Sequence, residues 1–228
     1  MESHGIKLLV VACNTASALA LPAIRRAVGV EVIGVIEPGA RAAVASSAQN
    51  VEAKNVGVVA TEATIRSRAY ANAIARLAPS VKVIERACPL FVSLAEEGWA
   101  ETDVARSVAA EYLQEIKADE VGTLVLGCTH YPILRRVIQE TMGEHVRLID
   151  SGEATAQDVE RLLAAKELAR PAIEKNSARE RHLCDDLDHF YVTDAAERFS
   201  RVAERFLGSA PSILEAVEVW GHDELRTH

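Results

Sequence analysis

The chain has 228 residues, 49% of them hydrophobic, and a formal net charge of -8. This length allows one large domain or two small ones, and the composition favours a globular protein with a real core over a disordered chain. The negative charge and the scattered basic residues argue against a nucleic-acid binder.

The apolar runs are of strand length, and none reaches the roughly 18 to 20 residues that a membrane span requires. We therefore expect a soluble protein with no membrane partner. No secretory signal precedes the first apolar run, and the four cysteines lack compact spacing. This pattern indicates a cytoplasmic protein with reduced thiols.

In the first half of the chain, strand-length apolar runs alternate with segments of helical periodicity. The predicted order is strand 7–12, helix 16–27, strand 30–36, helix 40–49, strand 56–60, a helix from residue 64 onward, and strand 81–86. Pro22 is expected to limit the regularity of the first helix in its middle, and Pro38 and Gly39 are expected to close the second strand. In the third helix Ile65, Ala69, Ala73 and Leu77 are expected to form one buried face.

The alternation continues in the second half. The predicted order is helix 89–97, helix 102–118 with Thr102 as its N-cap, strand 121–127, helix 132–141, strand 146–149, helix 151–166, a polar irregular stretch 167–181, a short strand within 182–192, helix 195–207 and strand 216–219. Strands separated by helices of this length predict parallel pairing through right-handed crossovers. The fold class is therefore α/β.

Two cysteines lie in near-matching frames, Cys13 in LLVVACNTAS and Cys128 in TLVLGCTHYP. In each frame a buried strand ends in a small residue, a cysteine and a polar turn. Open α/β sheets bind ligands at the carboxyl ends of their strands, so the two thiols are placed to face one small molecule from opposite sides. The matching frames also suggest an internal two-fold.

Two opposed thiols can invert a carbon centre. One waits as thiolate and removes a proton from one face, while the other returns a proton to the opposite face. Asn14 and Thr15 follow Cys13 in a turn before a helix, where backbone amides favour a carboxylate. Thr129 and His130 follow Cys128 in the equivalent place, and a histidine two residues from a cysteine can tune the protonation of the thiol.

Together, ACNTAS and GCTHYP resemble the glutamate racemases, cofactor-independent enzymes of the aspartate/glutamate racemase superfamily. The resemblance extends through GVVATEATIRS, ACPLFVSLAEEG, IDSGEA and FYVTDAAERFSRVAERFLG, which is nearly the whole chain. It implies an isomerase that interconverts L-glutamate and D-glutamate without a cofactor or a metal and supplies D-glutamate for peptidoglycan, and thus for cell wall and cell shape. Cys13 would serve one enantiomer and Cys128 the other.

The resemblance also implies helper residues. His130 matches the residue that assists the second cysteine, and Glu96 matches an acidic residue on the same side, with the adjacent Glu97 as an alternative register. Substrate contacts are implied at Asn14, Thr15 and Thr129, and also at Thr61 and Thr64, although helix capping explains the last two equally well.

The family architecture implies two parallel-sheet α/β domains related by a pseudo-two-fold, with the active site in the cleft between them. The first domain would contain residues 1–37 and 148–228, and the second residues 38–147. Family members begin with an Asp-Ser-Gly strand and a later Pro-Tyr-Gly segment, whereas this chain starts a few residues before the first cysteine strand. We therefore expect an incomplete first domain, and a homodimer is possible because dimers are common in the family.

Alternative functions are a truncated or inactive racemase-fold protein that binds a small acidic ligand, a racemase for aspartate or a related amino acid, and a thiol-redox protein. The redox alternative lacks the usual CxxC spacing. Cys88 and Cys184 are interpreted as core residues. The cluster His182, Cys184, Asp185, Asp186 and His189 lacks a recognised metal spacing, so no metal site is predicted.

Overall fold

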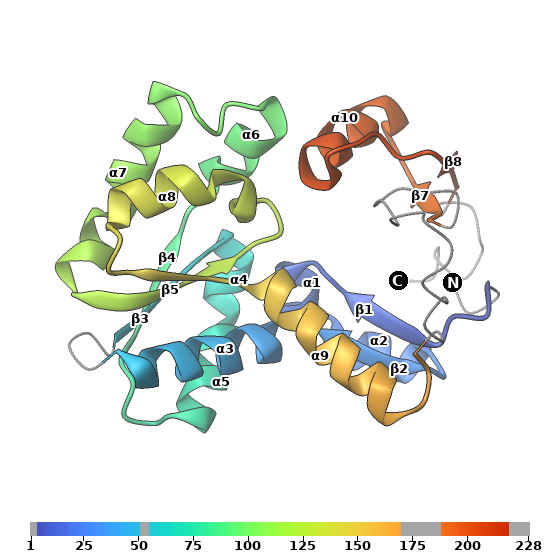
Figure 1. The fold of residues 1–228 in the computed structure, drawn as a ribbon, viewed down its shortest axis with the longest axis horizontal. Helices are drawn as coiled ribbons and strands as arrows, with labels where there is room; N and C mark the ends of the chain where they lie inside the picture. Colours follow the sequence, from blue (N-terminus) through green and yellow to red (C-terminus); the bar gives the residue numbers. More distant parts are fainter. Residues whose placement is uncertain (1–3, 51–54, 170–187, 219–228) are drawn as a thin grey trace, which may run out of the picture. The chain divides into compact units, whose positions relative to one another are not determined.

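The computed structural model describes residues 4–50, 55–169 and 188–218, which belong to two compact units, residues 1–170 and 171–228. All paired strands are parallel, which confirms the predicted α/β class (Figure 1). Among the described residues, no helix is long and apolar enough to cross a membrane. The predicted division into domains 1–37 with 148–228 and 38–147 stays a prediction.

The described residues of the first unit form two sheets. In the smaller one, β1 (Leu8–Val11) pairs with β2 (Glu31–Gly34). The larger one has the strand order β4-β3-β5-β6, with β3 at Asn55–Ala60, β4 at Val83–Ala87, β5 at Val121–Gly127 and β6 at Arg147–Asp150. Parallel pairing places the carboxyl ends of all four strands at one edge of the sheet.

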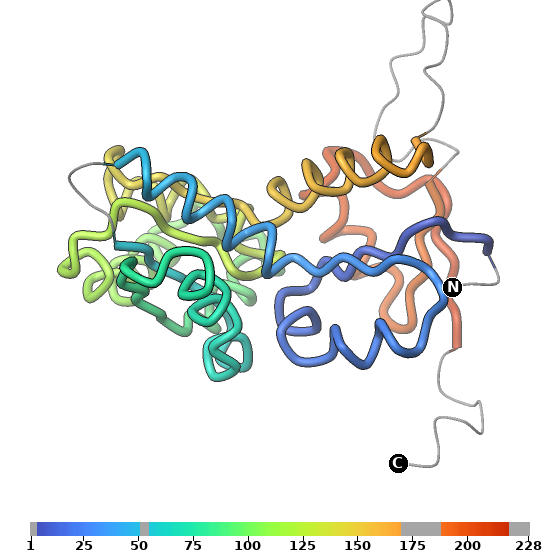
Figure 2. The backbone as a smooth tube through the Cα atoms, turned by 90° about the horizontal axis from the view of Figure 1, so that it is seen from below, coloured from blue at the N-terminus to red at the C-terminus, as the bar shows by residue number. Residues whose placement is uncertain are grey.

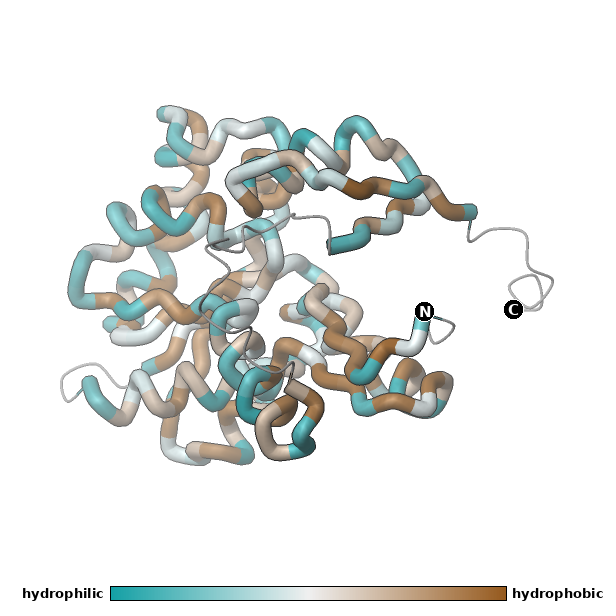
Figure 3. The backbone as a smooth tube through the Cα atoms, turned by 45° about the vertical axis from the view of Figure 1, so that its right-hand side comes forward, coloured by the Kyte–Doolittle hydropathy of each residue, from teal (hydrophilic) through white to brown (hydrophobic). Residues whose placement is uncertain are grey.

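Helices cover both faces of the larger sheet because successive side chains of a strand point to opposite faces. Leu124 and Leu126 of β5 join the core under one group of helices, and Val125 between them joins the other core. The first group is α6 (Leu90–Glu97), α7 (Asp103–Ala118) and α8 (Arg135–Met142), and the second includes α3 (Ile36–Gln49) and α5 (Ala69–Leu77). Figure 3 shows hydrophobic and hydrophilic residues alternating along the helical segments.

The chain passes between the two sheets of this unit twice, once from β2 into α3 and once from β6 into α9 (Ser151–Ala165), as Figures 1 and 2 show. Helix α1 (Asn14–Leu19), which follows β1, contacts α4 (Glu62–Ser67), which follows β3. The loops after strands of both sheets therefore meet near the crossing points.

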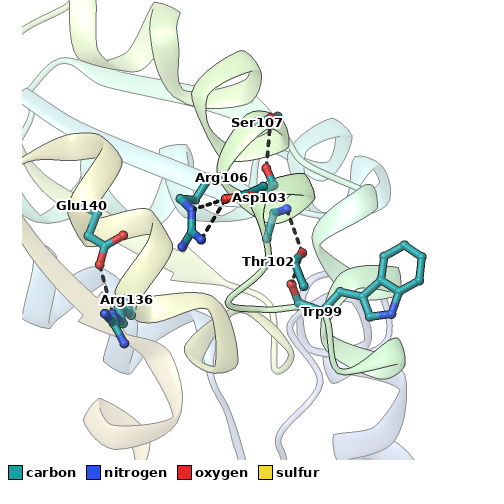
Figure 4. A network of polar contacts seen from close by, with 8 residues as sticks. Trp99, Thr102, Asp103, Arg106, Ser107, Arg136 and Glu140 are labelled. Carbon is teal, nitrogen blue, oxygen red and sulfur yellow. Dashed lines mark hydrogen bonds and ion pairs between the residues drawn. The ribbon is translucent and has the colours of Figure 1, made fainter.

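Helix α7 begins where the sequence predicts. The Thr102 hydroxyl accepts a hydrogen bond from the Ala105 N–H at 3.3 Å and donates one to the Trp99 carbonyl at 2.8 Å (Figure 4). This confirms Thr102 as the N-cap. Arg106 contacts Asp103 in the first turn, and the exposed pair Arg136–Glu140 lies on α8.

Several predicted element boundaries were wrong. The predicted helix 16–27 is divided at Ala20 into α1 and α2 (Leu21–Ala27), because Pro22 has no N–H to continue α1 and instead lies in the first turn of α2. The predicted strand 30–36 ends at Gly34, and Pro38 and Gly39 lie in the first turn of α3 instead of closing the strand. Proline is tolerated there because first-turn N–H groups have no partner within the helix.

The predicted helix from Thr64 is also interrupted. It divides into α4 and α5 at Arg68, which has a left-handed φ of 57° and pairs with Glu85 of β4 at 2.5 Å. The break rotates the helical face, so that Ala73 is buried while Leu77 is 45% exposed, and the prediction of one buried face ending at Leu77 was wrong. The predicted helix 132–141 starts as a 3-10 turn at Tyr131–Leu134 before α8.

The second unit has a strand-helix-strand order. β7 (Phe190–Val192) pairs in parallel with β8 (Leu214–Ala216), and α10 (Ala196–Leu207) connects them. The rings of Phe190 and Phe199 pack at 6.3 Å between centroids. The predicted last strand began at Ala216, where β8 ends. The predictions for residues 170–187, which include Cys184 and most of the His182–His189 cluster, lie outside the described residues.

Candidate active site

Cys13 lies two residues beyond the end of β1 and is the N-cap of α1. Its side chain is exposed, and its sulfur accepts a hydrogen bond from the Ala16 N–H at 3.4 Å. Ser17 holds this turn in place by two hydrogen bonds. Its hydroxyl donates to the Val11 carbonyl at 2.8 Å and accepts from the Val35 N–H at 3.2 Å. The thiol is therefore presented to solvent at the carboxyl end of its strand, the position that the sequence predicts.

Cys128 follows β5 directly but is 7% exposed. Burial is the main cause that raises the pKa of its thiol to about 11, and hydrogen bonds from the His130 and Tyr131 backbones limit the rise. Burial disfavours the charged form of a thiol. Cys128 is therefore protonated at neutral pH.

His130 links Cys128 to helix α6. Its Nδ1 is 3.9 Å from the Cys128 sulfur, and its Nε2 is 3.1 Å from Oε1 of Glu96. The neighbouring Glu97 is exposed. Of the two glutamates that the sequence left open, Glu96 is the one that contacts His130. The three residues form a chain of polar contacts that ends at the buried thiol.

Asn14 is 2% exposed and joins the two sheets of the first unit. Its Oδ1 accepts hydrogen bonds from the Tyr70 hydroxyl at 2.6 Å and from the Ser151 hydroxyl at 3.4 Å. Asp150 caps α9 by accepting from the Gly152 N–H at 2.8 Å, which fixes the turn that carries Ser151. The Nδ2 group of Asn14 has no hydrogen-bond partner among the residues that the structure describes.

Three threonine hydroxyls form a closed triangle. Thr15 is 2.9 Å from Thr61 and 3.0 Å from Thr64, and Thr61 and Thr64 are 3.1 Å apart. Thr61 is the N-cap of α4, but its side chain makes no capping hydrogen bond. Helix capping therefore does not account for the Thr61 hydroxyl. Thr129 is exposed and stands apart from this triangle in the Cys128 turn.

Two polar residues of this region were not among the predicted site residues. Ser151 lies in IDSGEA, whose Asp-Ser-Gly pattern is a helix-start signal. Tyr70 gave no local signal, because only the folded chain brings it beside Asn14.

Cys88 is fully buried and its pKa is raised by burial to about 12, which confirms it as a core residue. Within residues 4–50, 55–169 and 188–218, no three metal-ligating side chains cluster.

Comparisons with known proteins agree with this geometry. Residues 1–159 match the family model Asp/Glu/Hydantoin racemase. The chain is 52% identical to a glutamate racemase of Geobacter metallireducens over 203 residues, which is 89% of this chain and 70% of the relative. It is 46% identical to a glutamate racemase of Lactiplantibacillus plantarum over the same shares of both chains.

A solved structure is similar to the whole fold. Glutamate racemase from Francisella tularensis, in complex with D-glutamate, matches with a TM-score of 0.80 and 33% sequence identity over 95% of this chain and 75% of that chain. The sequence and structure comparisons therefore point to the same family.

Proposed function

This chain belongs to the Asp/Glu/Hydantoin racemase family, and on that premise we propose that it interconverts L-glutamate and D-glutamate with Cys13 and Cys128 as the two acid/base groups. It is an amino-acid racemase, an isomerase, and its product D-glutamate serves peptidoglycan synthesis. We also propose a cytoplasmic location, which the spacing of the cysteines supports, and a homodimer, which family membership supports.

The reaction exchanges one proton at Cα. One cysteine thiolate takes the proton, so the C–H bond breaks and its electron pair stays on the substrate. The other cysteine gives its thiol proton to the opposite face of Cα and becomes a thiolate. The configuration is inverted, and atoms and electrons balance without a redox partner. The positions of the thiolate and the thiol are exchanged after each turnover.

The protonation of Cys128 supports its role as the acid in the free protein. Its burial holds the thiol protonated at neutral pH, so it is ready to donate to a carbanion. In the reverse direction it must lose that proton, and His130 at 3.9 Å is the group beside it. A histidine held by Glu96 can accept the proton and, once charged, stabilise the thiolate.

The substrate carboxylate and the developing charge at Cα need hydrogen-bond donors. Asn14 contributes a buried side-chain NH2 group that no described residue accepts from. Thr15, Thr61 and Thr64 contribute hydroxyls that lie between α1 and α4. We assign these residues and Thr129 to substrate binding.

The observation that supports the proposal most directly is the hydrogen bonding that links the two cysteine turns. Ser151 donates both to Asn14, the residue after Cys13, at 3.4 Å and to the carbonyl of Leu126, two residues before Cys128, at 3.3 Å. The test is racemisation of L-glutamate in deuterated water. D-Glutamate should form with solvent deuterium at Cα, and Cys13→Ala and Cys128→Ala should each lower the rate by about 1000-fold.

The matched control is Cys88→Ala, which removes a buried thiol outside the site. It should retain racemisation. Failure of the unaltered chain to deuterate glutamate would contradict the proposed substrate, and equal loss in all three variants would contradict the assignment of the two thiols.

A further inference from the structure

Tyr70, Asn14 and Ser151 form a buried polar cluster next to both cysteine turns. Tyr70 of α5 is 1% exposed, and its hydroxyl donates to Asn14, the residue after Cys13, at 2.6 Å. Ser151 donates to the same Asn14 oxygen at 3.4 Å and to the Leu126 carbonyl of β5 at 3.3 Å. The amide oxygen of Asn14 is thereby held by donors from two helices of the first unit.

Tyr70 also contacts the turn of the second cysteine. A Cβ added to Gly127, the residue before Cys128, would lie 3.1 Å from Cε2 of Tyr70. One added to Gly39 at the start of α3 would lie 3.1 Å from the Tyr70 hydroxyl. Two glycines thus make room for this one side chain. Burial is also the main cause that raises the pKa of Tyr70, so its hydroxyl remains protonated and acts as a donor.

The amide nitrogen of Asn14 is the unexplained group of this cluster. Its oxygen has two donors, whereas its buried Nδ2 has no partner within the described part of the chain. Buried donors are hydrogen-bonded in the great majority of cases, and one left open in a folded protein calls for a partner from outside the chain. An anionic oxygen is the natural acceptor for two amide N–H groups.

We propose that Tyr70, assisted by Ser151, is a positioning residue that orients the Asn14 side-chain amide so that its N–H groups bind a carboxylate of the amino-acid substrate. This inference rests on the proposed function. Tyr70 acts through Asn14 and does not touch the reacting carbon. Without the two donors to its oxygen, the amide can rotate and present that oxygen to the carboxylate, which repels it.

Kinetics of Tyr70→Phe test the proposal, because phenylalanine keeps the ring between Gly39 and Gly127 and removes only the hydroxyl. We expect KM for both enantiomers to rise about tenfold with kcat within about twofold, since the substrate carboxylate is charged in both the ground state and the transition state and is bound equally in each. Ser151→Ala should raise KM in the same direction by less. The control Tyr112→Phe removes a hydroxyl that accepts from the Leu90 N–H and should leave KM unchanged.

A double-mutant cycle separates positioning from general loosening. In an Asn14→Ala background, Tyr70→Phe should have no further effect on KM, because the residue through which it acts is gone. An unchanged KM in Tyr70→Phe alone, or the same tenfold rise in both backgrounds, would overturn the proposal.

A second readout does not depend on glutamate turnover. The side-chain NH2 resonances of Asn14, identified by their loss in Asn14→Ala, should move toward those of exposed asparagines in Tyr70→Phe and stay in place in Tyr112→Phe. Unchanged resonances in Tyr70→Phe would overturn the positioning role even in an active racemase. A chain that fails to racemise glutamate but shows the resonance change would contradict the proposed function alone.

Discussion

The turns of Cys13 and Cys128 occupy equivalent places at the ends of parallel strands, but they place their thiols in different surroundings. Cys13 is exposed and receives a backbone N–H from the helix that it caps. Cys128 is buried and is approached by His130, which Glu96 holds at 3.1 Å. Equivalent positions in a two-fold arrangement therefore do not require equal chemistry, because a buried thiol needs a partner to ionise and an exposed one has solvent.

The largest difference between the Cys13 and Cys128 turns should come from His130. His130→Asn should lower kcat by about 100-fold, because Cys128 then has no neighbouring base to take its proton. Glu96→Gln should lower it by less, since it removes only the group that orients His130. Steady-state kinetics measure both effects. Glu97→Gln is the matched control, and a loss in that variant as large as in Glu96→Gln would contradict the assignment of Glu96.

The small residues before the two cysteines should differ in their tolerance of a larger side chain. A Cβ at Gly127 would lie 2.9 Å from the Val59 carbonyl oxygen, which is backbone and cannot move aside. Gly127→Ala should therefore lower the free energy of unfolding by about 1–3 kcal/mol. Ala12→Ser, at the equivalent exposed position before Cys13, should change it by less than about 0.5 kcal/mol. Denaturant titration of both variants measures the contrast, and equal effects would contradict it.

Burial of Cys128 should make stability depend on alkaline pH. The thiol ionises near 9.0 in the unfolded chain and near 11 in the folded one, so the unfolded chain releases its proton first. The stabilisation is fully present below about pH 9 and should fall by about 2 kcal/mol as the pH rises toward 11. Denaturant titrations between pH 8 and 11 should show a shallower decline for Cys128→Ala. An identical decline in that variant would contradict the assignment, and Cys88 should supply a similar decline in both proteins.

The smallest effect should be on the free energy of unfolding, when a threonine hydroxyl is removed near Cys13 or near Cys128. Thr64→Val removes the buried member of the threonine triangle and should lower the free energy of unfolding by about 1 kcal/mol. Thr129→Val, in the exposed turn after Cys128, should change it by less than about 0.5 kcal/mol. Thermal or denaturant unfolding compares the two. A larger loss in Thr129→Val than in Thr64→Val would contradict the difference in packing.

The sequence predicts the parts of this site that depend on local pattern. Apolar runs ending in a small residue and a cysteine correctly place both thiols at strand ends, and Thr102 is correctly identified as a cap. Helix breaks were missed where tertiary contacts decide them, as at Arg68, whose left-handed conformation is accompanied by an ion pair with Glu85 on a distant strand. Tyr70 was missed for the same reason, because its partners Asn14 and Gly127 lie 56 and 57 positions away.

The central claim is that the two thiols act on opposite faces of one carbon, and one-sided exchange tests it most directly. Cys13→Ala and Cys128→Ala each keep one base, so in deuterated water each should exchange the α-hydrogen of one glutamate enantiomer without inverting it. The account predicts that the two variants exchange opposite enantiomers, as followed by proton NMR of each pure enantiomer. Exchange of the same enantiomer by both variants would contradict it.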